Sequence, residues 1–457
     1  MTLLDDLKAI VGPHGWKTEP AELEPHVNDW RGLYSGRTPI LVAPQTTDEV
    51  SRVVRRCAQD RVGIVPQGGN TSTCGGSVPD DSNTQIILSL SRMNRIREVD
   101  VDNFSMEVEA GCILENVQNA AKSAGRIFPL SLGAEGSCQI GGNLATNAGG
   151  INVLRYGTAR AQVLGLEVVL ASGEIVNGLR ALRKDTVGYD LKQLFVGSEG
   201  TLGIITAATL RLYPDPGATT TAVVALAAAG DAVRLLSRVR SEVGDAIEAF
   251  ELISDKNARI VEAHIPELRL PFEQLSPWYV LMEVATGKDA EVLEAVLAAA
   301  MEDGLVLDGA LAKNATEAAE LWRLRHAIPE AERAHGTAIK HDIAVPVSSI
   351  AAFLEAGDEA IRATAPGAEL FAFGHVGDGN LHYNVQLPDG SDNGEQVTAA
   401  IYDLVIQFGG SISAEHGVGQ TKREWMPRVR SDVEMRLMRS LKNTLDPDNI
   451  LNPGKVI

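Results

Sequence analysis

Residues Pro66-Gln67-Gly68-Gly69-Asn70-Thr71-Ser72 form a glycine-rich stretch that directly follows the apolar run 62–65. Glycine has no Cβ, so a tight loop of this kind lets successive backbone N–H groups approach an anion such as a phosphate. A second, longer stretch of the same type covers Ser131–Asn143 and continues through residues 145–150. Glycine turns between strands are common, so one such loop alone would not establish a binding site.

The two glycine loops match neither of the common nucleotide-binding motifs. No Gly-Lys-Ser/Thr completes a Walker A loop, and no Gly-x-Gly-x-x-Gly opens a helix after a strand. Around the loops, residues 40–42, 86–88 and 163–170 are typical of short strands, and a capped helix is predicted over 46–59. This half of the chain is therefore predicted to be an α+β domain built around glycine loops.

The length and charge of the chain limit the classes of function. At 457 residues the chain is too long for one compact core, so two or more domains are expected. Lys plus Arg is 41 against 60 Asp plus Glu, a net charge of −19, which argues against nucleic acid and anionic membranes as partners. No run of 18 apolar residues occurs that would span a membrane.

The four cysteines, Cys57, Cys74, Cys112 and Cys138, show no metal-binding spacing. We interpret them as reduced thiols of a cytoplasmic protein, since disulfides are rare in that compartment. Residues 1–20 contain no apolar segment of signal-peptide length, which agrees with this expectation.

The chain after residue 215 is predicted to alternate strands and helices. Strands are expected at 219–226, 246–252 and 278–285, and helices at 231–243 and 289–301. This alternation favours a ferredoxin-like αβ sandwich. Residues 446–455 form a turn-rich tail that we expect to contain neither helix nor strand.

Two histidines flank a turn in residues 374–382, which read GHVGDGNLH. The turn predicts a hairpin, and on its two strands His375 and His382 can converge on one ion. Glu415 would supply a third ligand, a set that suits Zn²⁺, with Mn²⁺ or Co²⁺ as alternatives. Asn384 lies two residues after His382 and therefore on the same face of that strand.

His416 directly follows the third expected metal ligand, Glu415. A neutral imidazole beside a metal-activated hydroxyl can accept its proton, because histidine titrates near neutral pH. The alternative is a buried histidine bonded to the backbone, which is the usual state of a lone histidine.

Several motifs together resemble a known family. PQGGNT at 66–71, GGNLATNAGG at 141–150, YG at 156–157 and LFVGSEGTLGI at 194–204 resemble the FAD domain of the vanillyl-alcohol oxidase/p-cresol methylhydroxylase superfamily. GHVGDGNLH at 374–382, AEHG at 414–417 and NPGK at 452–455 are similar to its FAD-linked D-2-hydroxyacid dehydrogenase branch. The resemblance implies an FAD-binding domain over 1–215, a ferredoxin-like substrate and metal domain over 216–425, and a segment over 426–457 that returns to the FAD domain.

The resemblance also implies where FAD binds. Covalent members attach FAD through a histidine in the first loop, which this chain lacks, so non-covalent FAD is expected. Cys138 lies where some relatives use a cysteine linkage, but we interpret it as a packing residue. The positions implied at FAD are Pro66, Gln67, Gly68, Gly69, Asn70, Thr71, Ser72, Ser131, Gly133, Gly136, Ser137, Gly141, Gly142, Asn143, Asn147, Gly150, Gly157, Ile204 and Asn452.

Arg325 and Lys340 are the implied anion clamp for a small D-2-hydroxy acid. Arg325 is expected on a helix begun near Thr316, and Lys340 on a strand over 337–345. Both could instead be solvated charges, but Arg holds carboxylates well and Lys adds a point charge. Where hydroxyglutarate enzymes of the family have a threonine, this chain has Pro329, which offers no hydroxyl. The substrate is therefore left open among D-2-hydroxyglutarate, D-malate and D-lactate.

The resulting hypothesis is an FAD-dependent dehydrogenase with a metal at His375, His382 and Glu415 and His416 as general base. Reoxidation is expected through an electron-transfer flavoprotein or a quinone, and a homodimer is the candidate assembly. One alternative is a metal-dependent hydrolase that uses the His/His/Glu site, with structural glycine loops. Another is a non-catalytic regulatory or electron-transfer subunit, against which the retained His, Glu, Arg and Lys set argues.

Overall fold

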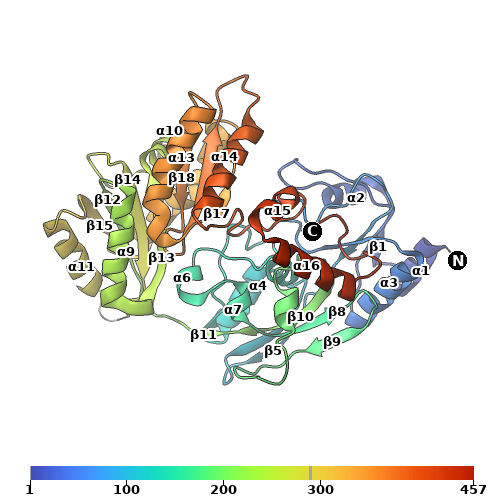
Figure 1. Cartoon of the computed structure of the whole chain (residues 1–457). Coiled ribbons are helices and arrows are strands. Elements are labelled where there is room, and N and C mark those ends of the chain that lie inside the picture. Colours follow the sequence, from blue (N-terminus) through green and yellow to red (C-terminus); the bar gives the residue numbers. More distant parts are fainter. Residues whose placement is uncertain (1, 288–290) are drawn as a thin grey trace. The chain divides into compact units, whose positions relative to one another are not determined.

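The computed structural model describes residues 2–287 and 291–457, and its chain divides into two compact units. The first unit combines the chain up to Gly150 with Tyr156–Asp215 and Glu415–Ile457. The second combines Ile151–Arg155 with Pro216–Ala414. Figure 1 shows the elements of both units along the chain. Across the described residues, no helix is long and apolar enough to cross a membrane.

The first unit begins with a small sheet of strand order β1-β2-β4-β3, in which β2, β4 and β3 are parallel. Helix α3 crosses from β2 to β3 and starts at Thr46, whose side chain accepts from the N–H of Glu49. Its buried face joins the apolar core of the sheet. The expected helix is confirmed as α3 (Thr47–Asp60), and the expected strands as β2 (Leu41–Val42), β3 (Ile64–Gln67) and β4 (Ile86–Ser89), whereas β1 (Trp16–Lys17) was not predicted.

A five-stranded antiparallel sheet of order β5-β6-β10-β8-β9 completes the first unit. A second apolar cluster packs against it, with Cys138 among its buried members. The strands are β5 (Ile96–Asp100), β6 (Ser105–Glu109), β8 (Val163–Val169), β9 (Ile175–Gly178) and β10 (Ile204–Arg211), and β7 (Arg126–Ile127) pairs with β11 (Tyr213–Pro214). The helices are α1 (Leu3–Val11), α2 (Pro20–Val27), α4 (Leu114–Ser123), α5 (Ile140–Ala145), α7 (Ala159–Gln162), α8 (Lys192–Phe195), α15 (Met426–Val429) and α16 (Asp432–Leu445). Helix α6 (Val153–Tyr156) lies mostly in the segment Ile151–Arg155 of the second unit.

The second unit is built on one antiparallel sheet of order β15-β12-β14-β13-β18-β19-β16, with β17 also paired to β19. The first four strands in this order follow the ferredoxin-like pattern, which confirms that prediction. The strands are β12 (Thr220–Leu226), β13 (Ile247–Ser254), β14 (Trp278–Val284), β15 (Asp308–Leu311), β16 (Ala338–Ile339), β17 (Asp342–Ala344), β18 (Glu369–Gly374) and β19 (Asn380–Gln386).

Helices cover both faces of this sheet. Helices α10 and α12 pack on one face, whereas α9 and α13 lie on the other, beside α11 and α14 (Figure 1). The expected start of a helix at residue 289 lies outside the described residues. The helices are α9 (Ala229–Val243), α10 (Asp255–His264), α11 (Glu291–Glu302), α12 (Ala315–His335), α13 (Ile350–Thr364) and α14 (Gly394–Gln407).

The strand expected over 337–345 is wrong as one element, because it is interrupted between β16 and β17. At the interruption, the ring Nδ1 of His341 lies 2.8 Å from the carbonyl oxygen of Tyr383. This side chain takes the ladder position that a backbone N–H would otherwise fill. Lys340 therefore lies in the break between two short strands.

Residues 415–425, which we expected in the substrate domain, fall in the first unit. The backbone N–H groups of Val418 and Gly419 donate to the Glu199 carboxylate at 2.7 and 2.9 Å. The N–H of Gln420 donates to the carbonyl of Cys74 at 2.8 Å. These bonds tie the segment that follows Glu415 to the loops of the first unit.

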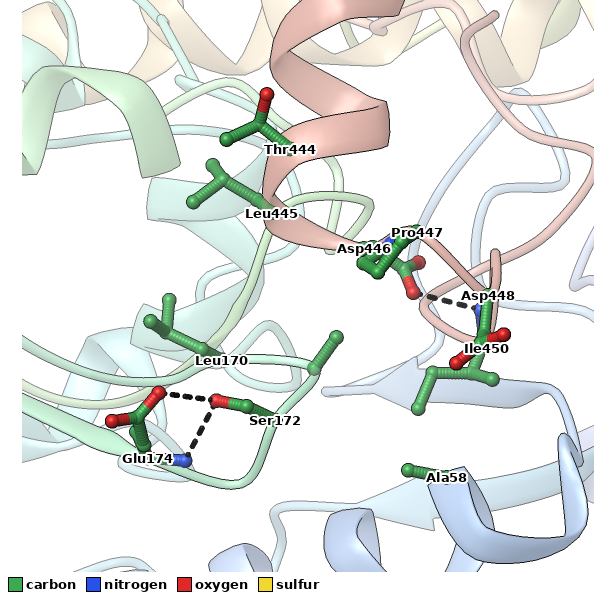
Figure 2. A pocket seen from close by; sticks show the side chains of 11 residues that line it. Ala58, Leu170, Ser172, Glu174, Thr444, Leu445, Asp446, Pro447, Asp448 and Ile450 are labelled. Carbon is green, nitrogen blue, oxygen red and sulfur yellow. Dashed lines mark hydrogen bonds between the residues drawn. The ribbon is translucent and has the colours of Figure 1, made fainter.

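The C-terminal tail is held by a buried ion pair at the end of α16. Lys442 Nζ donates to the carbonyls of Thr201 and Leu451 at 2.9 and 2.8 Å and pairs with Asp446. Burial lowers the pKa of Lys442, against the opposing effect of Asp446. Beside this junction, a cavity of about 370 Å³ lies between the end of α16 and the turn 170–174 (Figure 2).

We predict that Asp446→Ala destabilises the first unit by about 3–5 kcal/mol, because Lys442 would remain buried without its counter-charge. Asp446 also accepts the N–H groups of Ile450 and Leu451, so the tail loses two further bonds. Chemical denaturation of the wild type and the variant measures the difference. Asp448→Ala is the control, since its ion pair with Arg61 is exposed and should contribute less than about 1 kcal/mol. Equal stabilities of Asp446→Ala and the wild type would contradict this role.

Candidate active site and cofactor site

The amide side chains of the first glycine loop hold the loop itself. Gln67 is buried and donates through Nε2 to the carbonyls of His26 and Ser77, both at 2.9 Å. Asn70 has a left-handed backbone (φ 53°) and donates through Nδ2 to the carbonyls of Pro25 and Asn28. These amides are therefore occupied within the protein, which leaves the backbone N–H groups of the loop as its contribution to an anion site.

Glycine at two positions allows close backbone approaches, one between the two glycine-rich stretches and one within the second. A Cβ at Gly69 would lie 2.1 Å from the carbonyl oxygen of Ser137. A Cβ at Gly150 would lie 1.8 Å from the carbonyl oxygen of Ser131. No side chain fits at either point. The contact at Gly69 shows that the two stretches expected at FAD lie against each other in the first unit, and the contact at Gly150 shows that the second stretch folds back on its own start.

Helix α5 opens directly after the second loop and contributes a glycine with free space. A Cβ at Gly142 would meet no other atom within 4 Å. By contrast, a Cβ at Gly141, its neighbour, would lie 2.7 Å from the Cβ of Ala110. Gly141 is therefore needed for packing, whereas the backbone at Gly142 faces free space. A ligand could approach the backbone closely at Gly142.

Buried polar atoms without partners mark the same unit. Within residues 2–287 and 291–457, the atoms Gln139 Oε1, Asn143 Oδ1, Asn452 Oδ1 and Lys422 Nζ are buried and make no hydrogen bond. Buried polar atoms are normally paired, so an unpaired set needs an explanation. The atoms include both acceptors and a cation, which suits a cofactor with a polar heterocycle and phosphates. The first unit therefore fits FAD.

Asn452 and Asn147, two positions that the resemblance implies at FAD, are held by hydrogen bonds within the protein. Asn452 Nδ2 donates to the carbonyls of Gly76 and Glu199 at 2.9 and 2.8 Å, which docks the tail on the loops. Asn147 has φ 51° and accepts the N–H of Arg160 at 3.0 Å. All the expected FAD positions lie within the first unit.

Glu199 is a buried residue of this unit to which the sequence analysis assigned no role. It has a left-handed backbone (φ 50°), and its carboxylate accepts the N–H groups of Val418 and Gly419. Burial raises its pKa, against the opposing effect of these hydrogen bonds and of Lys422. The motif at 194–204 could have indicated a role for Glu199, because it is the one charged residue among small and apolar ones.

All four cysteines are buried and unpaired with one another. Burial raises the pKa of Cys57 to about 12 and that of Cys112 to about 11. Cys138 is 3% exposed and burial raises its pKa as well. This environment suits the packing role expected for Cys138, because a reactive thiol needs a lowered pKa.

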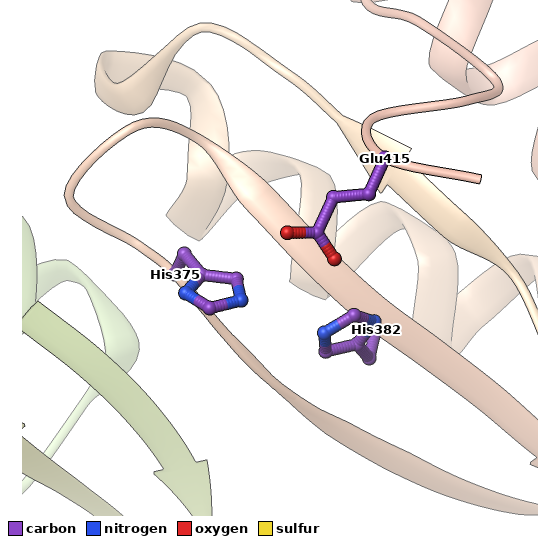
Figure 3. Close-up of side chains that lie close together, drawn as sticks. All are labelled: His375, His382 and Glu415. Carbon is purple, nitrogen blue, oxygen red and sulfur yellow. The ribbon is translucent and has the colours of Figure 1, made fainter. Parts of the chain in front are cut away.

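The hairpin histidines and Glu415 converge on one point. Their ligand atoms lie within 4.8 Å of one another, and the three side chains point toward one another (Figure 3). The predicted hairpin is confirmed as β18 and β19, with His382 on β19, whereas His375 lies directly after the end of β18 and not on the strand. Glu415 directly follows Ala414, whose N–H donates to the carbonyl of Asp342 at 3.3 Å. Two imidazoles and a carboxylate form a donor set that suits a catalytic divalent metal.

A second buried carboxylate stands behind this group. Glu251 on β13 is 0% exposed and lies with Oε1 2.6 Å from Nδ1 of His375. Its Oε2 accepts from Nε of Arg325, also at 2.6 Å. Burial alone would raise the pKa of Glu251, but His375 and Arg325 hold it well below its usual range. With Nδ1 directed at Glu251, His375 turns Nε2 toward the metal position.

The three residues expected to grip the substrate each have a protein carboxylate as partner. Arg325 on α12 is 6% exposed and pairs with Glu251. Lys340 lies 3.6 Å from Glu332, also on α12, and Asn384 donates to both oxygens of Glu332 at 3.1 and 2.8 Å. Burial raises the pKa of Glu332, against the opposing effect of Lys340. Neither glutamate was predicted from the sequence to have a role in the site.

His416 belongs to a second group of close ligand atoms. Atoms of Asp342, Glu415 and His416 lie within 4.8 Å of one another. Asp342 is 1% exposed and accepts from Nδ2 of Asn380 at 2.9 Å. A carboxylate beside an imidazole favours its protonated form, which is what a general base becomes during proton transfer.

Family comparisons match nearly the whole chain. The family described as FAD binding domain matches residues 38–178, and that described as FAD linked oxidases, C-terminal domain, matches residues 215–456. The chain belongs to the FAD-linked oxidases. The FAD binding domain match includes both glycine loops, which confirms FAD as the cofactor of this chain.

Curated relatives place this FAD-linked oxidase in the expected branch. It is 40% identical to D-2-hydroxyglutarate dehydrogenase of Xanthomonas citri pv. viticola, covering 96% of this chain and 93% of the relative. It is 40% identical to the mitochondrial D-2-hydroxyglutarate dehydrogenase of Bos taurus, covering 99% and 83%. It is 35% identical to a D-2-hydroxyglutarate–pyruvate transhydrogenase of Saccharomyces cerevisiae, covering 96% and 90%. The resemblance to FAD-linked D-2-hydroxyacid dehydrogenases is thereby confirmed.

Solved structures confirm the fold. p-Cresol methylhydroxylase with substrate bound aligns with a TM-score of 0.75 at 17% identity, over 99% of this chain and 96% of that chain. An alkyldihydroxyacetonephosphate synthase aligns with a TM-score of 0.75 at 19% identity, over 99% and 84%. These similarities establish the vanillyl-alcohol oxidase type of fold for this FAD-linked oxidase.

We predict that Gly142→Ala weakens FAD binding without harming the apoprotein. A methyl group meets no protein atom there and favours the helix by up to about 1 kcal/mol, so only a bound ligand would be displaced. Gly69→Ala is the matched comparison, since it should lower both FAD content and apoprotein stability by forcing the loops apart. FAD titration and thermal unfolding of the FAD-free proteins separate the two effects. Unchanged FAD affinity in Gly142→Ala would place the cofactor elsewhere.

Proposed function

We propose that this chain oxidises a D-2-hydroxy acid to the 2-oxo acid, with non-covalent FAD and a divalent metal. The observation that carries the proposal is the convergence of His375, His382 and Glu415 in a chain that belongs to the FAD-linked oxidases. A metal there suits activation of a hydroxyl group, and Zn²⁺ suits the donor set best, with Mn²⁺ or Co²⁺ as alternatives. The relatives' names support the same reaction.

Each residue of the site has a distinct role in this proposal. FAD, when bound, supplies a two-electron acceptor and the metal a Lewis acid. His416 takes the hydroxyl proton, and loss of a hydride from C2 then gives the 2-oxo acid. Glu251 positions His375, and Arg325 keeps Glu251 ionised. Arg325 engages Glu251 through Nε, and its terminal nitrogens are the donors that we assign to the substrate.

The acid itself is the open part of the proposal. The relatives are named for D-2-hydroxyglutarate, whereas Pro329 on α12 provides no hydroxyl for a second carboxylate. D-malate and D-lactate therefore stay as alternatives. For reoxidation we propose an electron-transfer flavoprotein or a quinone. The hydrolase alternative is not retained, because the FAD binding domain match covers the glycine loops that it left unexplained.

Anaerobic bleaching of the flavin absorbance with a panel of D- and L-2-hydroxy acids tests the activity. We expect D-2-hydroxy acids to reduce the flavin and their L-enantiomers to fail. Removal of the metal with a chelator should lower the bleaching rate by more than about tenfold, because the hydroxyl loses its Lewis acid, and added Zn²⁺ should restore it. A protein that bleaches equally with and without chelator would lack the metal role. A protein that no 2-hydroxy acid bleaches would disprove the activity.

We further predict that Glu251→Gln lowers metal affinity by about 10–100-fold, because His375 loses its carboxylate partner. Competition with a chromophoric chelator on FAD-loaded protein measures the affinity independently of turnover. Since the single variant leaves Arg325 buried without a counter-charge, Glu251→Gln/Arg325→Gln removes both charges together and should show the same loss. Glu283→Gln is the control, because Glu283 on the neighbouring strand β14 bonds to Trp322 and not to a metal ligand. Parental affinity in both Glu251 variants would refute the positioning role.

A further inference from the structure

Glu332 is a buried carboxylate that the proposed reaction does not use. It lies on α12, seven residues and therefore about two helical turns after Arg325, on the face that packs on the sheet. Glu332 is 3% exposed, and its partners come from α10, from β19 and from the break between β16 and β17. The partners are Lys340, Asn384 and Asn257 on α10. Nδ2 of Asn257 lies 3.4 Å from Oε1 of Glu332. A carboxylate this deep is held in place by all of these donors.

The partners of Glu332 are the donors that a second substrate carboxylate would need. Lys340 and Asn384 were the expected substrate ligands beside Arg325. Asn384 donates to both oxygens of Glu332, at 3.1 and 2.8 Å, so its N–H groups are already directed at a carboxyl group. The positive charge of Lys340 lies 3.6 Å from the same group. An incoming carboxylate must therefore compete with a carboxylate that is covalently part of the site.

The surrounding charges do not compensate for this competition. Arg325 is the other cation expected in the clamp, and it is matched by Glu251. Pro329 lies between Arg325 and Glu332 on α12 and has neither a hydroxyl nor a backbone N–H. Each of the two cations, Arg325 and Lys340, is thus paired with a buried carboxylate of the protein. One substrate carboxylate can still bind at the proposed metal position.

We propose that Glu332 is a specificity-determining residue that favours D-2-hydroxy acids with an uncharged side chain over dicarboxylic ones. The inference rests on the proposed function, since it concerns the substrate of that same site. A single carboxylate binds with the hydroxyl at the metal end. A second carboxylate at the Glu332 end meets like charge and donors that are already bonded, which disfavours it.

The test compares two acids of equal chain length on the metal- and FAD-loaded protein. D-2-hydroxyvalerate has a neutral side chain, and D-2-hydroxyglutarate ends in a second carboxylate. We expect the wild type to show a higher kcat/KM for D-2-hydroxyvalerate. Glu332→Gln should raise kcat/KM for D-2-hydroxyglutarate by at least about tenfold, mainly through KM, because the like charge is removed. Its kcat/KM for D-2-hydroxyvalerate should change by less than about threefold.

Glu330→Gln is the matched control, because Glu330 is an exposed carboxylate two residues earlier on α12 and should leave the ratio unchanged. Thermal unfolding and FAD content check the fold of each variant, and the wild-type ratio decides the matter if Glu332→Gln fails to fold. A wild type that prefers D-2-hydroxyglutarate would overturn the inference, as would a folded Glu332→Gln variant with an unchanged ratio. Failure of both acids to reduce the flavin, while the dicarboxylic acid D-malate succeeds, would also overturn it. Failure of every D-2-hydroxy acid would instead remove the proposed function.

Discussion

The second unit depends on one fully buried carboxylate. Glu251 has no exposed surface, and its two oxygens face Arg325 on α12 and His375 at the end of β18. An unpaired charge at that depth would be strongly destabilising, so the three elements are held in one arrangement. The position of β13 in the middle of the sheet brings its side chain between helix and hairpin. The geometry of the metal position therefore follows from the same contact that stabilises the core.

In the first unit, by contrast, some buried polar groups have no partner within the protein. In the first glycine loop, the side-chain amides of Gln67 and Asn70 donate to carbonyl groups of the protein. The backbone N–H groups of the loop are then the donors that a ligand could use. Deeper in the unit, Asn143 and Lys422 keep buried polar atoms that find no partner in the described part of the chain. Loops that are rigid before binding lose little conformational freedom on binding. The unpaired atoms then mark where the protein leaves bonds for the cofactor to complete.

The sequence predicted the features that depend on local pattern. These features are the glycine loops, the hairpin around residues 376–379 and the αβ alternation. Each depends on residues that are close in sequence, and the structure contains all of them. It did not predict the partners of Arg325 and Lys340, because Glu251 and Glu332 reach them through sheet order and helix packing. The break at His341 was missed for a related reason, since a side chain there replaces a backbone bond across to β19. A charged residue inside an apolar strand, such as Glu251 in the run 247–254, is the signal that would have indicated a buried partner.

Glu251 and Glu332 show how the same device can have different consequences. Both are buried glutamates that neutralise a cation expected to bind substrate. Glu251 faces His375, which we propose as a metal ligand, so its charge would support metal binding whatever acid is bound. Glu332 faces donors at the far end, where substrates of this class differ from one another. Overall similarity to dehydrogenases of one acid fixes the fold and the reaction, because those depend on the whole chain. The choice of acid depends on few contacts, and a single buried carboxylate among them is sufficient to change it.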